Sequence, residues 1–160
     1  MPVSSDQIDD RMRRFSATCI GAGLKVTHQR TEIFRELAGS EEHPDADLIF
    51  RRVRLRVPAI SRDTVYRTLA ALEKHGLVRK AEILDDRGRY DANTSRHHHF
   101  VCTECGAVRD FYSKDLDALP IPRGVKSLGS IESTHVQVRG ICIICAAKKP
   151  RSLKSVIASP

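Results

Sequence analysis

The sequence contains no long hydrophobic run. No segment of its 160 residues approaches the roughly 18 consecutive apolar residues that a membrane span requires. The N-terminal stretch MPVSSDQIDDRMRRF also lacks the apolar segment of a secretory signal. We therefore expect a cytoplasmic protein with no membrane partner.

Cysteine is scarce and odd in number, with five residues in the chain. The cytosol keeps thiols reduced, so an odd, small set of cysteines argues against a disulfide framework. Paired cysteines in that compartment usually bind metal. The cysteine pattern therefore directs attention to metal sites.

Positive charge is concentrated in one segment. The chain carries a net charge of +7, and residues 51–80 contain nine Lys or Arg against Asp63 and Glu73, an excess equal to that of the whole chain. Such a segment suits a polyanion, because Lys and Arg near phosphates release condensed counterions. A solvated basic face explains the charge equally well, so charge alone leaves both interpretations open.

The first part of the chain has the signals of four helices followed by a hairpin. Apolar residues spaced three and four apart predict buried stripes, and capping residues mark the ends of the helices. The first expected helix runs from Asp6 to Ala22, the second follows a cap at Thr27 and stops at Gly39, the third opens at Pro44 and Asp45 and ends at Pro58, and the fourth follows a cap at Ser61 and ends at Gly76. The expected hairpin pairs residues 77–83 with 89–91 across Asp85–Gly88. The inward stripes are Ile8, Met12, Phe15, Cys19 and Ala22; Ile33, Phe34 and Leu37; Leu48, Ile49, Val53 and Leu55; and Val65, Leu69 and Leu72.

This order of elements is that of a winged helix, whose fourth helix would enter the major groove of double-stranded DNA. The face of that helix opposite the apolar stripe carries Arg62, Thr64, Tyr66 and Arg67, which can bond base edges and phosphates. An exposed amphipathic helix is the alternative. At the start of the second helix, His28 and Arg30 can contact phosphate or serve only as capping residues.

A second, α+β domain follows a change in composition near Asn93. The pattern predicts strands around residues 99–111, a short helix over 115–119 and strands again between Val125 and Ile141. Residues 146–160 are basic and poorly patterned, which predicts a frayed tail. The expected domain limits are 1–92 for DNA binding, 93–147 for the second domain and 148–160 for the tail.

Two C-x-x-C pairs give the strongest signal in the chain. Cys102 and Cys105 form one pair and Cys142 and Cys145 the other. Four thiolates can close a tetrahedral zinc site, and a two-residue gap lets both sulfurs of a turn face one ion. All four positions would then be taken by sulfur, which favours a structural role over catalysis. A thiol-based redox switch is the alternative interpretation.

A histidine run precedes the first cysteine pair. On an extended strand, His97 and His99 point to one face and can share an ion. Asp91 and Asp110 can add carboxylate oxygens, and His43 can reach in from the start of the third helix. Nitrogen and oxygen ligands suit Fe(II), Mn(II) or Zn(II) better than a thiolate-loving metal. An inert, exposed histidine run is the alternative.

Taken together, these motifs resemble the ferric uptake regulator family. They appear in the family's order over about residues 8–147. The matching segments are Gly23–Arg30, His43–Ala46, Ser61–Leu69, Arg89–Asp91, His97–Gly106 and Cys142–Cys145.

The resemblance implies a homodimeric, DNA-binding transcriptional repressor and not an enzyme. It implies an N-terminal winged helix-turn-helix joined to an α/β dimerisation domain, with structural zinc on Cys102, Cys105, Cys142 and Cys145. A regulatory metal would be held by His43, Asp91, His97, His99 and Asp110. These five residues come from both domains, so the ion would set the angle between the two domains. The dimer would then have the shape that fits an operator.

The chain has aspartate at positions 91 and 110, where iron sensors of the family commonly have glutamate. In this respect it is similar to the peroxide-sensing branch of the family. The resemblance then implies Fe(II) or Mn(II) in the regulatory site, with His43 and His97 matching the histidines that peroxide oxidises. A further metal site of many family members would keep only Asp117 and His135 here. The alternatives are an iron- or zinc-level sensor that does not respond to peroxide and a zinc enzyme that activates water.

Overall fold

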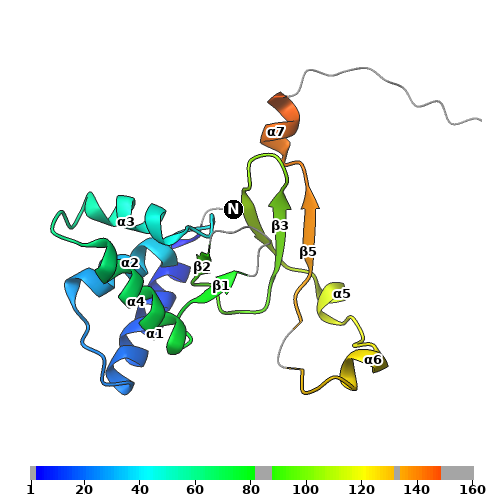
Figure 1. Cartoon of the computed structure of the whole chain (residues 1–160), viewed down its shortest axis with the longest axis horizontal. Coiled ribbons are helices and arrows are strands. Elements are labelled where there is room, and N and C mark those ends of the chain that lie inside the picture. Colours follow the sequence, from blue (N-terminus) through cyan, green and yellow to red (C-terminus); the bar gives the residue numbers. More distant parts are fainter. Residues whose placement is uncertain (1–2, 82–87, 132–133, 149–160) are drawn as a thin grey trace, which may run out of the picture. The chain divides into compact units, whose positions relative to one another are not determined.

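The computed structural model describes residues 3–81, 88–131 and 134–148 (Figure 1). The chain divides into two compact units between His97 and His98. Unit 1 comprises residues 1–97, and unit 2 comprises residues 98–160. In the described ranges, no helix is long and apolar enough to cross a membrane.

Unit 1 contains four helices, each capped by the side chain of the residue before it. They are α1 (Ser5–Gly21), α2 (His28–Ala38), α3 (Ala46–Arg54) and α4 (Arg62–Lys74). The side-chain oxygens of Ser4, Thr27, Asp45 and Ser61 each accept a backbone N–H of the first turn. These bonds satisfy amide groups that a helix leaves without an internal partner. The four predicted helices are therefore confirmed.

The core of unit 1 lies between these helices. Phe15 of α1 stacks on Phe34 of α2, with ring centroids 4.7 Å apart. Two stripe positions were wrongly predicted, since Ala22 is exposed and Leu55 is 84% exposed. Leu55 follows buried Val53 by two residues, which places it about 200° around the helix axis and off the buried face of α3, where Phe50 is buried instead.

The hairpin of unit 1 is short. Strands β1 (Arg79–Ala81) and β2 (Arg89–Asp91) pair antiparallel, with Arg79 opposite Asp91. The remainder of the predicted hairpin, residues 82–87, lies outside the described residues. A further bridge links Asp45 to Arg89, and the carbonyl of Pro44 accepts the amide N–H of Tyr90 at 3.1 Å. The start of α3 is thus fixed to β2 by main-chain contacts.

Unit 2 is built on a three-stranded sheet in the order β4-β3-β5. Strand β3 (His98–Cys102) pairs antiparallel with β4 (Val108–Phe111) and parallel with β5 (Gln137–Gly140). Three short helices complete the described part of the unit: α5 (Lys114–Asp117), α6 (Arg123–Lys126) and α7 (Ile143–Lys148).

Two predictions for unit 2 were wrong. Residues 123–126 form the one-turn helix α6 after Pro122, where a strand was expected from Val125. The frayed tail was expected from Ala146, but α7 runs to Lys148, and its first turn is closed by a bond from the Ala146 amide to the Cys142 carbonyl. Residues 149–160 lie outside the described residues.

Candidate metal centres and DNA-binding face

The four cysteines of the two C-x-x-C pairs come together in unit 2. Their sulfur atoms all lie within 4.8 Å of one another, and Cys105 Sγ is 3.9 Å from Cys142 Sγ. Ligands around tetrahedral zinc with Zn–S bonds of about 2.3 Å are separated by about 3.8 Å. The four-cysteine group therefore has the donors and the spacing of a structural zinc site.

Backbone amides of the two cysteine turns point at the sulfurs. The Cys142 amide donates to Cys102 Sγ at 3.3 Å, and the Cys145 amide donates to Cys142 Sγ at 3.4 Å. Bonds from the amides of Cys105 and Cys142 lower the pKa of the Cys102 thiol to about 6. Sulfur contacts with Cys105 and Cys142 raise the pKa of Cys145 to about 12. Four crowded sulfurs cannot all ionise without a cation, so these opposed shifts fit a metal-binding group.

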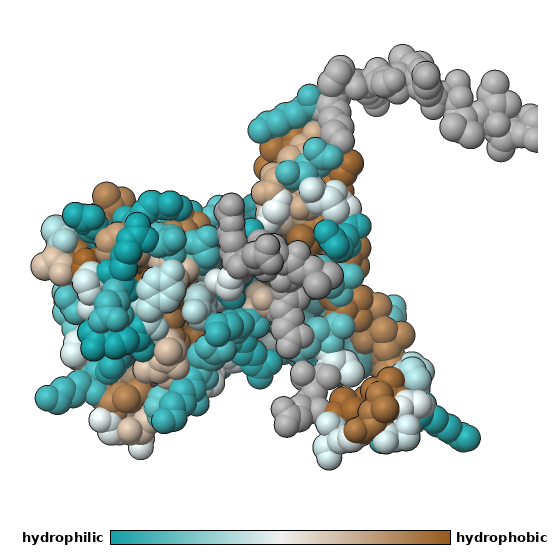
Figure 2. All heavy atoms as spheres, in the orientation of Figure 1, coloured by the Kyte–Doolittle hydropathy of each residue, from teal (hydrophilic) through white to brown (hydrophobic). Residues whose placement is uncertain are grey.

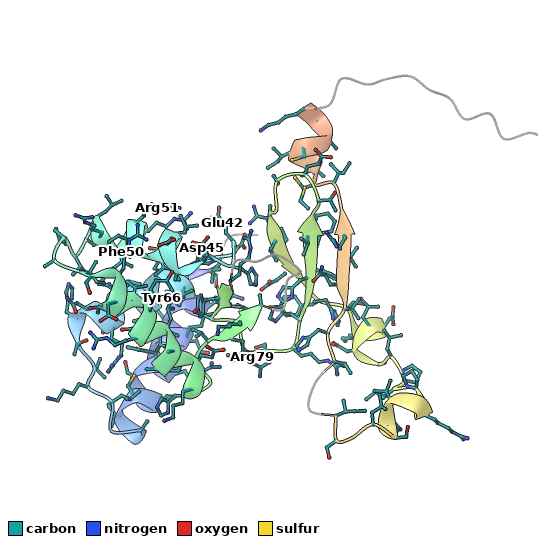
Figure 3. All side chains as sticks on the ribbon, viewed as in Figure 1. Glu42, Asp45, Phe50, Arg51, Tyr66 and Arg79 are labelled. Atoms are coloured by element: carbon teal, nitrogen blue, oxygen red, sulfur yellow. The ribbon has the colours of Figure 1, made fainter. Side chains whose placement is uncertain are left out.

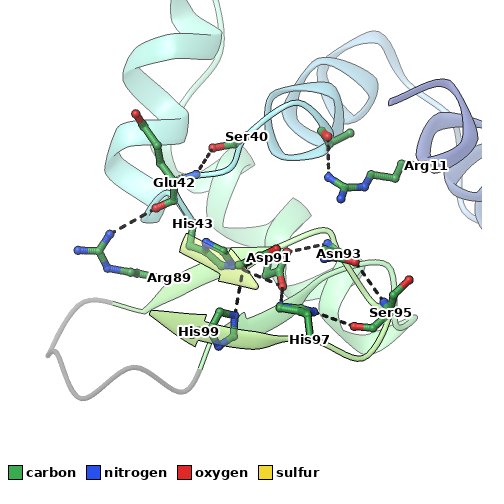
Figure 4. Close-up of polar contacts among 12 residues, drawn as sticks. Arg11, Ser40, Glu42, His43, Arg89, Asp91, Asn93, Ser95, His97 and His99 are labelled. Atoms are coloured by element: carbon green, nitrogen blue, oxygen red, sulfur yellow. Dashed lines mark hydrogen bonds and ion pairs between the residues drawn. The ribbon is translucent and has the colours of Figure 1, made fainter. Parts of the chain in front are cut away.

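In unit 1, His43, Asp91 and His97 form a buried group. Their exposed fractions are 2%, 7% and 7%, and they offer ligand atoms within 4.8 Å of one another. The Oδ2 atom of Asp91 lies 2.9 Å from His97 Nε2 and 3.5 Å from His43 Nε2. Figure 4 shows both imidazoles turned toward this carboxylate. Two imidazole nitrogens and one carboxylate are a ligand set for a divalent transition metal.

The tautomer of His97 is fixed by the backbone. Its Nδ1 lies 2.7 Å from the Ser95 carbonyl oxygen, which can only accept, so Nδ1 must carry the proton (Figure 4). The Nε2 atom, which lies against Asp91, is then the atom that would exchange its proton for a cation. Metal-binding histidines characteristically donate their other ring N–H to a carbonyl or carboxylate, which fixes the ring.

Asp91 is held in its ionised form. Burial raises the pKa of its carboxyl group, but hydrogen bonds from His43 and His97 outweigh burial, and the net pKa lies well below the usual range. Its Oδ1 atom also accepts the Asn93 amide at 2.6 Å. A permanently charged, oriented carboxylate is the form that binds a cation.

Main-chain geometry brings His43 beside Asp91. His43 has a φ of 48°, the left-handed region that a residue other than glycine seldom adopts, and it is the only such non-glycine residue in the described chain. Pro44 and Asp45 then pair with β2, the strand that carries Asp91. Unusual backbone conformations of this kind concentrate at functional sites.

Two supporting residues in this group were missed by the sequence interpretation. The Asn93 amide binds Asp91, and Asn93 Oδ1 accepts the Ser95 amide at 3.3 Å, which places the Ser95 carbonyl against His97. Asp and Asn side chains that bond the amide two residues ahead are a known turn signal. The pattern Asp-x-Asn-x-Ser over residues 91–95 could have revealed both turns.

The other predicted regulatory ligands lie on neighbouring strands of unit 2. His99 on β3 and Asp110 on β4 are register partners, and His99 Nε2 is 3.7 Å from Asp110 Oδ1. The adjacent His98 is 1% exposed, with Nε2 3.4 Å from Asp117 Oδ1. His135 is exposed. In the ranges that the structure covers, Asp117 and His135 do not join a group of three ligand atoms.

The predicted DNA-contacting residues lie on unit 1. Arg62, Tyr66 and Arg67 are exposed on α4, whereas Thr64 is half-buried, with its hydroxyl 2.9 Å from that of Ser61. Arg67 pairs with Asp63 at 2.7 Å on the same helix. His28 is exposed at the start of α2, and Arg30 is half-buried and bonds the Lys25 carbonyl.

The sequence profile described as the ferric uptake regulator family matches residues 21–138 of this chain. The chain belongs to the ferric uptake regulator family. Members of this family are metal-responsive transcription regulators. The resemblance drawn from the motifs is confirmed.

Individual relatives of the ferric uptake regulator family agree with this assignment. The peroxide-responsive repressor PerR of Staphylococcus epidermidis is 31% identical over 147 residues, covering 91% of this chain and 97% of the relative. The ferric uptake regulator of Helicobacter pylori, whose structure is described as having three functional metal-binding sites, has the same fold, with a TM-score of 0.70 at 22% identity over 95% of this chain and 99% of that chain. A zinc-bound manganese uptake regulator matches with a TM-score of 0.65 at 29% identity, covering 80% of this chain and 98% of that chain.

Proposed function

We propose that this chain is a homodimeric repressor that binds operator DNA when a divalent cation occupies a regulatory site, and that it releases DNA in response to peroxide. The regulatory ligands are His43, Asp91 and His97, joined by His99 and Asp110 of unit 2. The regulatory cation is Fe(II) or Mn(II), and zinc occupies the four-cysteine group. DNA contacts come from α4 and from the start of α2.

The observation that carries this proposal is the buried group of His43, Asp91 and His97. His97 presents Nε2 toward an ionised carboxylate, and its other nitrogen is already bonded to Ser95. Imidazole nitrogens and a carboxylate, with no thiolate in the group, suit Fe(II), Mn(II) or Zn(II). The resemblance to the peroxide-responsive repressor favours the first two. A cation there would draw the three side chains together without changing their hydrogen-bonded supports.

The extension to His99 and Asp110 rests on their pairing across β3 and β4 and on the resemblance to the family. His99 follows His97 by two residues, so an extended chain turns both imidazoles to one side. A ligand set drawn from both units would couple cation binding to the orientation of α4. Such coupling works because the cation stabilises the conformation that binds DNA more than the others.

Peroxide sensing is the finer part of the proposal. It is supported by the 31% identity to PerR and by aspartate at positions 91 and 110. Fe(II) held by these residues would supply the electrons that reduce hydrogen peroxide, and the oxidant so formed would lie close to the ligands of the metal. His43 and His97 are the side chains exposed to that oxidant, and oxidation of either ring would remove a donor nitrogen from the site.

The test is DNA binding by the full-length protein loaded with Fe(II) or Mn(II), with and without hydrogen peroxide. We expect peroxide to release DNA only from the iron form, with one oxygen gained on the peptides containing His43 or His97, measured by mass spectrometry. Release without oxygen gain would favour a sensor of metal level. His97→Ala should abolish cation-dependent DNA binding, whereas His135→Ala, at an exposed histidine, should leave it intact.

A further inference from the structure

Arg62, the first residue of α4, is held by two side chains of the neighbouring helix α3. Its Nη1 atom pairs with Asp47 Oδ1. Its guanidinium carbon lies 4.8 Å from the centre of the Phe50 ring, within the range of a cation–π contact. Asp47 therefore fixes an edge of the guanidinium, and the Phe50 ring fixes its plane.

Of the two supporting side chains, Phe50 is anchored in the core, and Asp47, which is 49% exposed, stands on a capped helix turn. Phe50 is 8% exposed and belongs to the core of unit 1, and Arg54 lies over the same ring at 5.7 Å. Asp47 stands in the first turn of α3, whose cap Asp45 accepts the Leu48 amide at 2.7 Å. In Figure 3, Phe50 and Tyr66 mark α3 and α4 on the same side of unit 1.

The contacts of Arg62 leave most of its donors available. Guanidinium has five N–H donors, and within the described part of the chain Arg62 contacts Asp47 and Phe50. The edge formed by Nε and Nη2 can therefore donate two parallel bonds. The side chain is 60% exposed, so that edge is open to a ligand.

Guanine fits such an edge. Its O6 and N7 atoms accept a pair of bonds from arginine in the major groove, the most frequent base-specific contact in protein–DNA complexes. Holding a long side chain in one geometry before binding reduces the conformational entropy that binding would otherwise cost. Arg67 differs, because its partner Asp63 is an exposed residue of the same helix and both side chains exceed 70% exposure.

We propose that Asp47 and Phe50 are positioning residues that set the guanidinium of Arg62 to read one guanine of the operator. This inference rests on the proposed DNA-binding function and assigns base recognition at one position to a trio of residues from two helices. Asp47 acts by orientation, since its negative charge by itself disfavours DNA.

The experiment selects sequences from randomised DNA duplexes with the full-length, Mn(II)-loaded protein and its variants. Arg62→Ala should lose the preference for guanine at one position of the half-site, by about 5- to 150-fold. Asp47→Asn, which keeps the size of the side chain and removes its charge, should reduce the preference at that same position and at no other. Phe50→Leu should do the same, and Phe50→Tyr should retain the preference.

Asp10→Asn is the matched control, because it removes one negative charge from an exposed pair with Arg13 on α1. Affinity for a non-specific duplex separates misfolding from lost positioning, since a misfolded variant weakens binding to every sequence. The inference would be overturned if Asp47→Asn kept its full preference for guanine at the position where Arg62→Ala loses that preference. An Arg62→Ala protein with an unchanged preference would also overturn it. If the wild-type protein enriched no sequence, the proposed function itself would fail, and this inference with it.

Discussion

Among the described residues, unit 1 buries nineteen apolar side chains in one cluster, whereas unit 2 buries only Val101, Cys102 and Val108. The large exposed apolar residues show the opposite distribution. Nine of them belong to unit 2, against four in unit 1. Figure 2 shows hydrophobic surface over α6 and α7. The exposed residues of unit 2 are Tyr112, Leu119, Val125, Leu128, Ile131, Val138, Ile141, Ile143 and Ile144.

This difference shows that the two units are stabilised in different ways. Unit 1 has a core large enough to support four helices. A unit with a very small core usually needs a metal or an oligomeric partner to fold stably. Unit 2 has a four-cysteine group and an exposed apolar surface, which suit those two sources of stability.

Removal of zinc should have the largest effect and tests directly whether the two units are stabilised in different ways. Cys142→Ser should release the metal and unfold unit 2 while unit 1 stays folded, because structural zinc contributes about 10–16 kcal/mol in small domains. Zinc content and limited proteolysis, with a protected fragment near residues 1–97, would measure this. The matched control is Cys19→Ala, at a buried cysteine of unit 1, which should retain zinc. A folded unit 2 without zinc would contradict the prediction.

A core substitution in unit 1 should have the reverse selectivity. Phe34→Ala removes a ring that is 1% exposed and stacked on Phe15, and it should lower the free energy of unfolding of unit 1 by about 3–5 kcal/mol. Denaturant unfolding measures this change, and zinc content should not change. Leu55→Ala, at a side chain that is 84% exposed, should alter stability by no more than about 0.5 kcal/mol. Equal effects of the two variants would disprove the assigned core.

A smaller effect is expected from the ion-pair network that joins α2 to the end of α3. The Glu32 side chain is 8% exposed, and its carboxylate lies 2.8 Å from Arg56 and 3.2 Å from Arg35. Glu32→Ala should lower the free energy of unfolding of unit 1 by about 1.5–3 kcal/mol. Asp10→Ala breaks an exposed pair and should cost no more than about 0.5 kcal/mol. An unchanged free energy of unfolding in Glu32→Ala would show that the network adds no stability to unit 1.

The exposed surface of unit 2 gives the smallest effect on folding. Replacing Ile143 and Ile144 of α7 together by serine should leave the unfolding of unit 1 unchanged and weaken homodimerisation about tenfold or more, because two apolar side chains lose a partner surface. Analytical ultracentrifugation measures the dissociation constant. Ile20→Ser changes an isoleucine of unit 1 that is 72% exposed and should leave dimerisation intact. An unchanged dimer would exclude α7 from the interface.

Local signals in the sequence accounted for most of unit 1. Thr27 and Ser61 cap the helices that they were predicted to cap, because capping depends on residues only three positions apart. The four cysteines were also predicted to meet, and their spacing alone was sufficient for this. The five-residue regulatory ligand set and the DNA contacts stay predictions.

Contacts between distant residues could not be predicted in this way. Arg62 meets Asp47 fifteen residues away, and no periodic pattern specifies which exposed carboxylate an arginine will contact. The helix α6 was missed because four residues carry too little periodicity to separate a helical turn from a strand. The left-handed backbone of His43 was missed because side-chain type only weakly predicts a positive φ outside glycine.

The bond between the Tyr90 amide and the Pro44 carbonyl has a consequence for how this protein can change over evolutionary time. The distance between two donor side chains, His43 and Asp91, is set there by peptide groups, which every residue except proline supplies in full. Substitutions at position 90 that still fill the place of Tyr90 in the core of unit 1 would therefore leave this tether intact, because the amide continues to hold the donors in register. Proline at that position is the one replacement that would remove the tether.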